Sequence, residues 1–325
     1  IKVLNYFGIW LENGDGGADG GGTRESGLSL SAQDGPGGSA LGAARSERTL
    51  SIFVGTWNMG ESEVGKDGRR GDDDALAKWI EDGHDLYCVG VQECLIVDDV
   101  EAAIGRVLAA RSDADEKEEW QSWKHSIGSE HTEVGFHGFI AIIVFVRKSE
   151  VASGNFEPTG RATGTKGGQL ATGKNVGGKK LANKGAVGCS FRWCDTTLAF
   201  ANAHLASDAG DGTSKAEKRN SDAHTILRHL KIDMEDVEFD WPLLHHQAFF
   251  LGDLNYRIHM QPEEAVEETV SAVQAKDWSR LHGADELMAE MRGDRVFSGF
   301  EEANGGPDFP PTYRRVRGAN PGDYS

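Results

Sequence analysis

Short apolar segments rich in β-branched residues recur six times after residue 50, and this pattern restricts the possible folds more than any other feature of the chain. In several of these segments neighbouring residues are both apolar, which is typical of strands that are covered on both faces. We therefore predict strands over residues 50–57, 86–91, 138–146, 186–191, 197–203 and 248–251.

Segments with helical character lie between these runs. Residues 72–81 begin with three aspartates, which are favourable near a helix N-terminus, and 99–110 carries four apolar residues at helical spacing. Further helices are predicted over 214–230 and 263–273. Strands and helices that interleave in this way indicate a layered α/β (α+β) domain.

The first 50 residues differ in composition from the rest. They hold 12 of the 43 glycines, and such a segment has too little apolar surface to offset its chain entropy. We predict that 1–50 is a flexible segment or the remnant of an upstream region, with 1–10 apolar enough to form a strand, and that the domain occupies 51–325. The longest apolar run, 139–146, is far shorter than the roughly 20 residues of a membrane-spanning helix.

The overall charge limits the possible partners. The chain has 52 acidic against 34 basic residues, a formal net charge of −18, which argues against nucleic-acid binding. An anionic ligand would therefore need a local basic pocket. The four cysteines lie in or beside apolar runs without a Cys-x-x-Cys pair, so we expect buried reduced thiols and a cytoplasmic protein.

Polar side chains stand at the ends of four predicted strands. Ligands bind α/β sheets at the carboxyl ends of their strands, where rigid elements hold several groups in fixed positions. A single such residue is more often structural, but four ends with complementary chemistry favour a functional site. The residues are Asn58, Glu93, His204 and Asp253.

The chemistry of these four side chains is complementary. Glu93 and Asn58 offer the hard oxygen ligands that suit Mg²⁺. Asp253 could orient or deprotonate a water molecule, and His204 could donate a hydrogen bond to a developing anionic oxygen.

A basic segment adds an electrostatic signal. Residues 158–194 contain no acidic residue but seven basic ones, and seven glycines lie between 160 and 178. Glycines let backbone N–H groups approach an anion and lysines add positive charge, although a solvated loop with incidental charge is the alternative. The pair Asn183-Lys184 abuts the next strand, and Tyr313-Arg314 follows two prolines near the end, a setting suited to phosphate recognition. With the strand-end residues, these features predict a metal-dependent phosphoesterase.

Six motifs resemble the catalytic domain of inositol polyphosphate 5-phosphatases. They are GTWN at 55–58, GVQE at 90–93, NKGAV at 183–187, HLA at 204–206, FLGDLNYR at 250–257 and FPPTY at 309–313. The resemblance covers about 50–325 in the family's motif order, and GDLNYR is its most specific part. It implies a deoxyribonuclease I-like four-layer sandwich, in which two packed β-sheets are flanked by helices.

The resemblance also implies an activity: Mg²⁺-dependent removal of the 5-phosphate from phosphoinositides, such as phosphatidylinositol 4,5-bisphosphate, or from soluble inositol polyphosphates. We expect an enzyme of this kind to work in the cytoplasm, peripherally at membranes. Glu93 would ligate Mg²⁺ with Asn58 nearby. His204 would contact the scissile phosphate, and Asp253 would activate the attacking water.

Further roles follow from the same motifs. Asn255 would hold the phosphate, and Lys184, next to Asn183, would help to neutralise it. Tyr313 and Arg314 match positions that recognise the neighbouring 4-phosphate. Arg257 is expected to support its loop, and the adjacent histidines at 245 and 246 are expected to be structural.

The sequence departs from the family pattern in two places. The loop between 159 and 181 is longer and richer in glycine than the family pattern. No role of a family residue can therefore be transferred to its lysines. The chain also stops before the family's Pro-Ala-Trp-Cys-Asp-Arg motif and a later Asp-His pair, so we expect a C-terminally truncated catalytic domain. Two alternatives stay open: another deoxyribonuclease I-like phosphodiesterase, such as a nuclease or sphingomyelinase, and a non-catalytic fragment that binds head groups.

Overall fold

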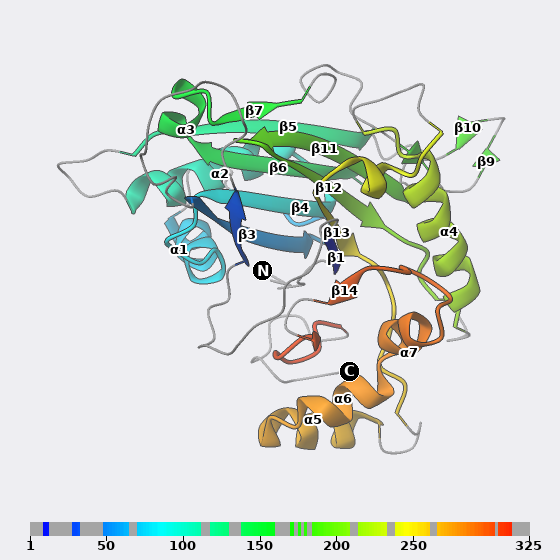
Figure 1. Cartoon of the computed structure of the whole chain (residues 1–325). Coiled ribbons are helices and arrows are strands. Elements are labelled where there is room, and N and C mark those ends of the chain that lie inside the picture. The colour runs from blue at the N-terminus through cyan, green and yellow to red at the C-terminus, as the bar shows by residue number, and fades with distance from the viewer. Residues whose placement is uncertain are drawn as a thin grey trace.

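Two β-sheets form the centre of the molecule (Figure 1). The computed structural model describes residues 9–12, 28–32, 48–64, 70–111, 118–129, 138–159, 170–171, 175–176, 179–180, 184–208, 214–232, 238–260, 265–302 and 305–313. The fold below refers to these residues.

One sheet has five strands in the order β2-β3-β4-β6-β5. β3 and β4 run parallel, and the other neighbours are antiparallel. Nearly every side chain of β4 and β6 is buried, which explains the continuous apolar runs of the sequence: strands covered on both faces need apolar residues on both. The bounds are β2 (Leu28–Ala32), β3 (Arg48–Asn58), β4 (Leu86–Cys94), β5 (Trp120–Ser129) and β6 (Gly138–Arg147).

The second sheet has seven strands, in the order β14-β1-β13-β12-β11-β7 with β8 also paired to β11. Its central strands β12 and β13 are parallel, and the other pairs are antiparallel. The bounds are β1 (Ile9–Glu12), β7 (Phe156–Pro158), β8 (Leu170–Ala171), β11 (Gly185–Trp193), β12 (Thr196–His204), β13 (Gln247–Asp253) and β14 (Glu301–Glu302). A separate ribbon pairs β9 (Asn175–Val176) with β10 (Lys179–Lys180).

The two sheets face each other across an apolar core. Inward side chains from both sheets form one buried cluster, including Cys88 and Ile142 from one sheet and Val187, Phe200 and Phe249 from the other. This core fixes the distance between the sheets, and with it the distance between residues at their strand ends.

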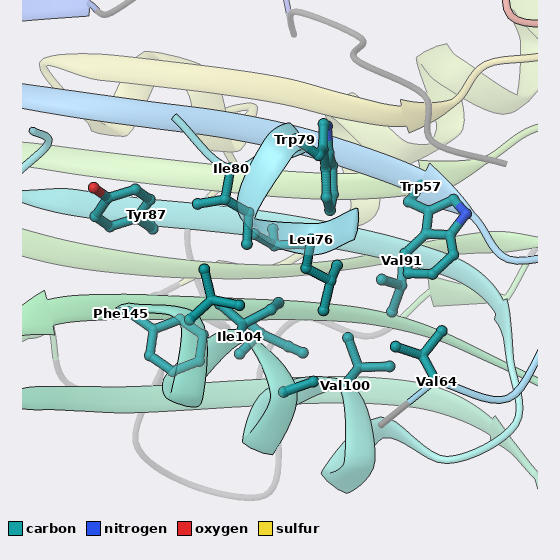
Figure 2. Packing of buried hydrophobic residues seen from close by; sticks show 14 of the residues in the cluster. Trp57, Val64, Leu76, Trp79, Ile80, Tyr87, Val91, Val100, Ile104 and Phe145 are labelled. Atoms are coloured by element: carbon teal, nitrogen blue, oxygen red, sulfur yellow. The ribbon is translucent and has the colours of Figure 1, made fainter. Parts of the chain in front are cut away.

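Helices cover the outer face of the five-stranded sheet. α1 (Arg70–Trp79) and α2 (Val97–Ala110) insert Leu76, Trp79 and Ile104 against Trp57 and Phe145 of the strands (Figure 2). Complete burial of a side chain of this size contributes about 1.5–3 kcal/mol. The rigid support explains why the ends of β3 and β4 can hold functional groups in place.

A second set of helices covers the seven-stranded sheet. α4 (Ala216–His229) packs Ala223 and Ile226 into a cluster with Phe250 of β13. α3 (Lys148–Ala152) follows β6, and the 3-10 turn η3 (Trp241–Leu244) precedes β13. α5 (Ala265–Ala275), α6 (Trp278–Ala284) and α7 (Glu286–Arg292) lie together at one end of the molecule (Figure 1). The four-layer sandwich of two packed sheets flanked by helices is confirmed.

The predicted strands after residue 50 and the four predicted helices are all present. The elements that were not foreseen after residue 50 are β5, β7, β8, β9, β10, β14, α3, η3, α6 and α7. Within 1–50, β1 overlaps the strand predicted for 1–10 and pairs with β13, whereas β2, which pairs with β3, was not foreseen. Backbone hydrogen bonds to existing sheets can hold short strands despite glycine-rich flanks. The domain boundary at residue 50 stays a prediction.

No helix in the described part of the chain has the length and apolar character needed to cross a bilayer.

Candidate active site

The four polar strand ends meet at one edge of the sandwich. Parallel pairing sets Asn58 of β3 opposite Gln92, the residue before Glu93 on β4. Parallel pairing likewise sets His204 of β12 opposite Asp253 of β13. Each sheet therefore brings two functional side chains to the carboxyl ends of neighbouring strands.

Asn58 joins the two pairs. Its Nδ2 donates a hydrogen bond to Asp253 Oδ2 at 2.8 Å and another to Glu93 Oε1 at 3.2 Å. Its Oδ1 accepts a hydrogen bond from the backbone N–H of Gly60 at 2.9 Å, which fixes the orientation of the amide. One side chain thus links a carboxylate of one sheet to a carboxylate of the other.

Two basic side chains lie beside these carboxylates. Lys184 precedes β11, whose antiparallel pairing with β12 sets its neighbour Gly185 opposite His204. The Lys184 Nζ lies 2.5 Å from His204 Nε2, and that Nε2 lies 3.4 Å from Asp253 Oδ2 and 3.9 Å from Glu93 Oε1. The His204 Nδ1 is buried and has no hydrogen-bond partner among the residues described.

The charges of the site influence one another. Burial alone would raise the pKa of Asp253, but a hydrogen bond and positive charge from His204, the charge of Lys184 and the Asn58 amide hold that pKa well below its usual range. Burial lowers the pKa of Lys184, and the negative charges of Asp253 and Glu93 oppose this effect. Asp253 is therefore an ionised carboxylate at neutral pH.

Two site residues have left-handed backbone conformations. Glu93 has φ of 50° and Asn255 has φ of 60°. Non-glycine residues rarely adopt this region, and when they do they cluster at functional sites held by their surroundings. At Glu93 the ladder between β4 and β6 is irregular, because the register shifts between Val91 and Cys94.

Asn255 is held by the protein through both ends of its amide. Its Nδ2 donates to the Leu205 carbonyl at 3.0 Å, and its Oδ1 accepts from Arg257 Nη2 at 2.7 Å. The Arg257 guanidinium also lies 4.0 Å from the centre of the Tyr313 ring, and about half of Tyr313 is exposed. Arg257 thus connects the loop after β13 with the segment that carries Tyr313.

The structure brings together most of the predicted site residues. Asn58, Glu93, Lys184, His204 and Asp253 form one cluster, and Asn255 follows two residues after Asp253. The roles assigned to them stay predictions.

Other predicted residues fall outside this cluster or outside the description. Asn183 and Arg314 lie outside the described residues, as do Arg161, Lys166 and Lys174 of the basic segment. The two histidines that are expected to be structural both form hydrogen bonds within the protein. His245 Nδ1 lies 2.8 Å from the Trp241 carbonyl oxygen, and His246 Nδ1 lies 2.8 Å from Thr197 Oγ1.

An ion-pair network behind the site was missed from the sequence. Arg219 of α4 is fully buried and contacts Asp208 at 2.6 Å as well as Glu286 of α7. Asp208 Oδ2 lies 3.8 Å from Arg257 Nε, so the network reaches the arginine that contacts Asn255. One signal could have revealed it: Arg219 is in helical phase with the buried Ala223 and Ile226.

The donor set suits a hard divalent cation. Among the described residues, no three His, Cys, Asp or Glu side chains come together as a complete protein cage for a metal. Mg²⁺ rarely needs one, because it is usually bound through one or two carboxylates together with water and substrate phosphates. Glu93 and Asp253, linked by Asn58, supply two carboxylates, so the residues present fit Mg²⁺.

Two helix-flanked sheets that present this cluster at their joined edge define a deoxyribonuclease I-like protein. Residues 55–325 match the family described as Endonuclease/Exonuclease/phosphatase family 2, and the chain belongs to that family.

Two curated relatives are similar to this chain in sequence. Phosphatidylinositol 3,4,5-trisphosphate 5-phosphatase 1 of Xenopus laevis is 32% identical over 292 residues, which cover 83% of this chain and 24% of that protein. The Homo sapiens protein of the same name is 32% identical over 279 residues, covering 82% and 21%. The chain therefore spans less than a quarter of the length of these relatives. The resemblance to inositol polyphosphate 5-phosphatases is confirmed.

A solved structure shares the fold. It is the inositol polyphosphate 5-phosphatase domain of SPsynaptojanin in complex with inositol (1,4)-bisphosphate and calcium ion. The TM-score is 0.61 at 22% identity, and the match covers 85% of this chain and 71% of that one.

Proposed function

We propose that this chain is a phosphomonoesterase domain that removes the 5-phosphate from an inositol head group. The substrate would be a phosphoinositide, such as phosphatidylinositol 4,5-bisphosphate, or a soluble inositol polyphosphate. The observation that carries the proposal is the Asn58 link between Glu93 and Asp253, with Lys184 and His204 beside it. The names of the relatives support the substrate class.

Two basic side chains allow the site to bind a phosphate group. Lys184 and His204 converge where two carboxylates would otherwise repel an anion. In the reaction, water forms a bond to phosphorus while the bond to the inositol 5-oxygen breaks. One proton of the water passes to that oxygen, and the other stays with the inorganic phosphate that is released. Positive groups next to the phosphoryl oxygens lower the barrier by stabilising their charge.

Asp253 is suited to hold the attacking water. Its lowered pKa keeps the carboxylate ionised at neutral pH, so it accepts a hydrogen bond from water and orients it. The Asn58 amide holds Oδ2 of Asp253, and Oδ1 accepts the backbone N–H of Asn255 at 3.2 Å. A carboxylate fixed at both oxygens can position water with little loss of entropy.

Glu93 would hold Mg²⁺, and Asn58, whose Nδ2 donates to Glu93 Oε1, would orient that carboxylate. When bound, the cation supplies Lewis-acid neutralisation of charge on the phosphoryl oxygens. About one third of the Glu93 side chain is exposed, which gives solvent and substrate access to this carboxylate.

Tyr313 and Arg314 are proposed to recognise the neighbouring 4-phosphate, and Asn183 to assist Lys184. Supporting this, the Tyr313 ring lies against Arg257, which contacts Asn255 next to the proposed site of hydrolysis. The proposal also includes a cytoplasmic location and peripheral contact with membranes when the substrate is a lipid.

A substrate panel tests the function. With Mg²⁺ present, we expect the chain to release inorganic phosphate from phosphatidylinositol 4,5-bisphosphate in vesicles or from soluble inositol polyphosphates. DNA nicking or release of choline phosphate instead would assign it to the phosphodiesterases. Binding of the head group without turnover would identify a non-catalytic fragment.

Asp253→Asn isolates the role of the carboxylate. It preserves shape and removes the negative charge, so turnover should fall by roughly 10²–10⁴, the usual contribution of a positioned acid–base group. Asp195→Asn is the matched control, because Asp195 is exposed in the turn between β11 and β12, at the end of these strands away from the site. A folded Asp253→Asn variant as active as this control would contradict the proposal.

A further inference from the structure

Three polar side chains lie buried between the sheets, directly below the site. Thr56 of β3, Gln92 of β4 and Asn202 of β12 are 2%, 0% and 0% exposed and are surrounded by the apolar core. A buried amide costs free energy unless its hydrogen bonds are made, so such a group needs a specific reason to be there.

Asn202 crosses from one sheet to the other. Its Nδ2 donates to the Ala141 carbonyl at 2.7 Å and to the Val91 carbonyl at 3.1 Å. These two residues are register partners on β6 and β4, and they form the last regular pair before the ladder shifts between Val91 and Cys94. Asn202 thus binds the five-stranded sheet at the edge of its β-bulge.

The same side chain also holds the first residue within this bulge. The Gln92 Nε2 donates to Asn202 Oδ1 at 2.6 Å and to Thr56 Oγ1 at 2.9 Å. Asn202 therefore fixes both the carbonyl of residue 91 and the side chain of residue 92. The next residue is Glu93, whose φ of 50° is sustained only if its neighbours are held.

The backbone is shaped to accept this amide. A Cβ atom placed on Gly90 would lie 2.5 Å from Asn202 Oδ1 and 3.0 Å from the Leu251 side chain. Only glycine leaves that space, so β4 approaches the opposite sheet closely at the point where the amide crosses.

The contacts connect the two halves of the site. Asn202 lies two residues before His204 on the same face of β12, and it pairs with Leu251, two residues before Asp253. We propose that Asn202 is a positioning residue that, through Gln92 and the bulge, fixes Glu93 relative to His204 and Asp253. The proposal deepens the proposed function, since it concerns the carboxylate assigned there to the metal.

The test compares Asn202→Leu with Phe200→Leu in the full chain. Leucine has the same number of side-chain heavy atoms and the same branching at Cγ as asparagine, and it removes the donated and accepted hydrogen bonds of Asn202. Phe200 is a fully buried neighbour on β12 whose shortening loosens the core without touching the bulge. Thermal unfolding shows whether both variants fold and how far each is destabilised.

The first measurement is hydrogen exchange of peptides that cover residues 91–95. Asn202→Leu should speed exchange in this segment at least tenfold relative to Phe200→Leu, because the anchor of the bulge is lost. Equal exchange in the two variants would overturn the proposal. This readout does not depend on metal or substrate.

The second measurement is Mg²⁺ binding by calorimetry. Loss of a residue that orients a metal ligand typically weakens affinity by about 10–100-fold, and we expect this for Asn202→Leu but not for Phe200→Leu. Unchanged Mg²⁺ affinity in Asn202→Leu, with Glu93→Gln weakened, would overturn the positioning role. Unchanged affinity in Glu93→Gln would instead remove Glu93 from the metal site, leaving the exchange result to decide on Asn202.

Discussion

Asn58 shows how much of the site depends on one side chain. It donates to a carboxylate from each sheet and accepts the Gly60 N–H, so it makes three hydrogen bonds with two functions: it joins the carboxylates and it shapes the turn after β3. Substitutions can separate these functions because aspartate can keep the second while losing the first.

We expect both Asn58→Asp and Asn58→Leu to lower kcat/KM by roughly 10–100-fold, since hydrogen bonds to charged groups contribute about 1.5–3 kcal/mol. The Asn58 amide also lowers the Asp253 pKa, so the acidic limb of the pH–rate profile should move to higher pH in Asn58→Leu. Steady-state kinetics across pH measures both effects. Near-normal rates in Asn58→Asp would mean that only the Gly60 turn matters.

Glu302 predicts a pH dependence of stability. Burial, assisted by the negative charge of Asp285, raises its pKa from 4.5 to about 8. Between these values the folded state keeps the proton that the unfolded state has lost, so the free energy of unfolding falls as pH rises through this window and levels off above it. The slope is at most about 1.4 kcal/mol per pH unit.

Urea unfolding at pH 5, 6, 7 and 8 checks this prediction. Glu302→Gln should remove most of the slope, so that its advantage over the parent chain grows with pH. Glu301→Gln, which changes the exposed neighbour, should leave the slope as it was. Parallel curves for the parent and Glu302→Gln would contradict the assignment.

Most of the central site residues could be predicted from the sequence because they follow regular strands. Asn58, Glu93, His204 and Asp253 each end a run whose apolar character was evident. Gln92 and Asn202 were visible beside them, but their importance was not, because it depends on contacts between residues 110 positions apart. Arg219 and Asp208 were missed because a buried ion pair leaves no local signal beyond helical phase.

At the level of elements, the parallel strands β12 and β13 approach each other closely at Gly252. Gly252 has φ of 135°, and a Cβ atom there would lie 1.9 Å from the Ala203 carbonyl oxygen. The close approach brings His204 and Asp253 side by side. Any side chain at 252 would therefore push apart the strands that carry the site.

Gly252→Ala should destabilise the fold by about 3 kcal/mol or more, from backbone strain and steric overlap together. Gly283→Ala provides the contrast. Its Cβ would meet nothing within 4 Å and it lies in α6, where alanine is preferred to glycine by roughly 0.5–1 kcal/mol. Chemical unfolding should thus show a lower free energy of unfolding for Gly252→Ala and a higher one for Gly283→Ala. Equal changes in the two variants would contradict the assigned role of Gly252.

The elements that the sequence did not reveal have weak local signals, for reasons that differ between them. β5 is only partly buried along most of its length, so its residues lack a continuous apolar run. α6 and α7 have seven residues each, too few for a clear periodicity, and begin at Asp277 and Asp285, whose side chains cap them. Those N-caps were the available signal. β2 is a strand because β3 is there to receive its backbone hydrogen bonds.

Across the whole molecule, the net charge of −18 and the proposed anionic substrate are compatible because positive charge is local. Lys184 and His204 lie among the carboxylates of the site, while most other basic groups described pair with acidic ones, as Arg106 does with Asp73 and Arg48 with Glu150. The acidic exterior remains unfavourable for nucleic acid.

The N-terminal strand tests how far the fold extends beyond the predicted domain. β1 pairs with β13 at four positions and with β14 at two, so it lies between β14 and β13, the strand that ends in Asp253. A chain that begins at residue 28 would leave β13 as an edge strand and remove the partner of β14. Each lost hydrogen bond contributes about 1 kcal/mol, so a loss of a few kcal/mol is expected.

The variant that begins at residue 28 should therefore unfold at a lower temperature, with faster hydrogen exchange in peptides that cover 247–253. A variant that begins at residue 9 keeps β1 and is the matched control. If residues before 28 were only a flexible segment, both variants would unfold and exchange as the parent chain does. A difference confined to the shorter variant would instead show that the sheet supporting Asp253 needs a strand from outside the predicted catalytic domain.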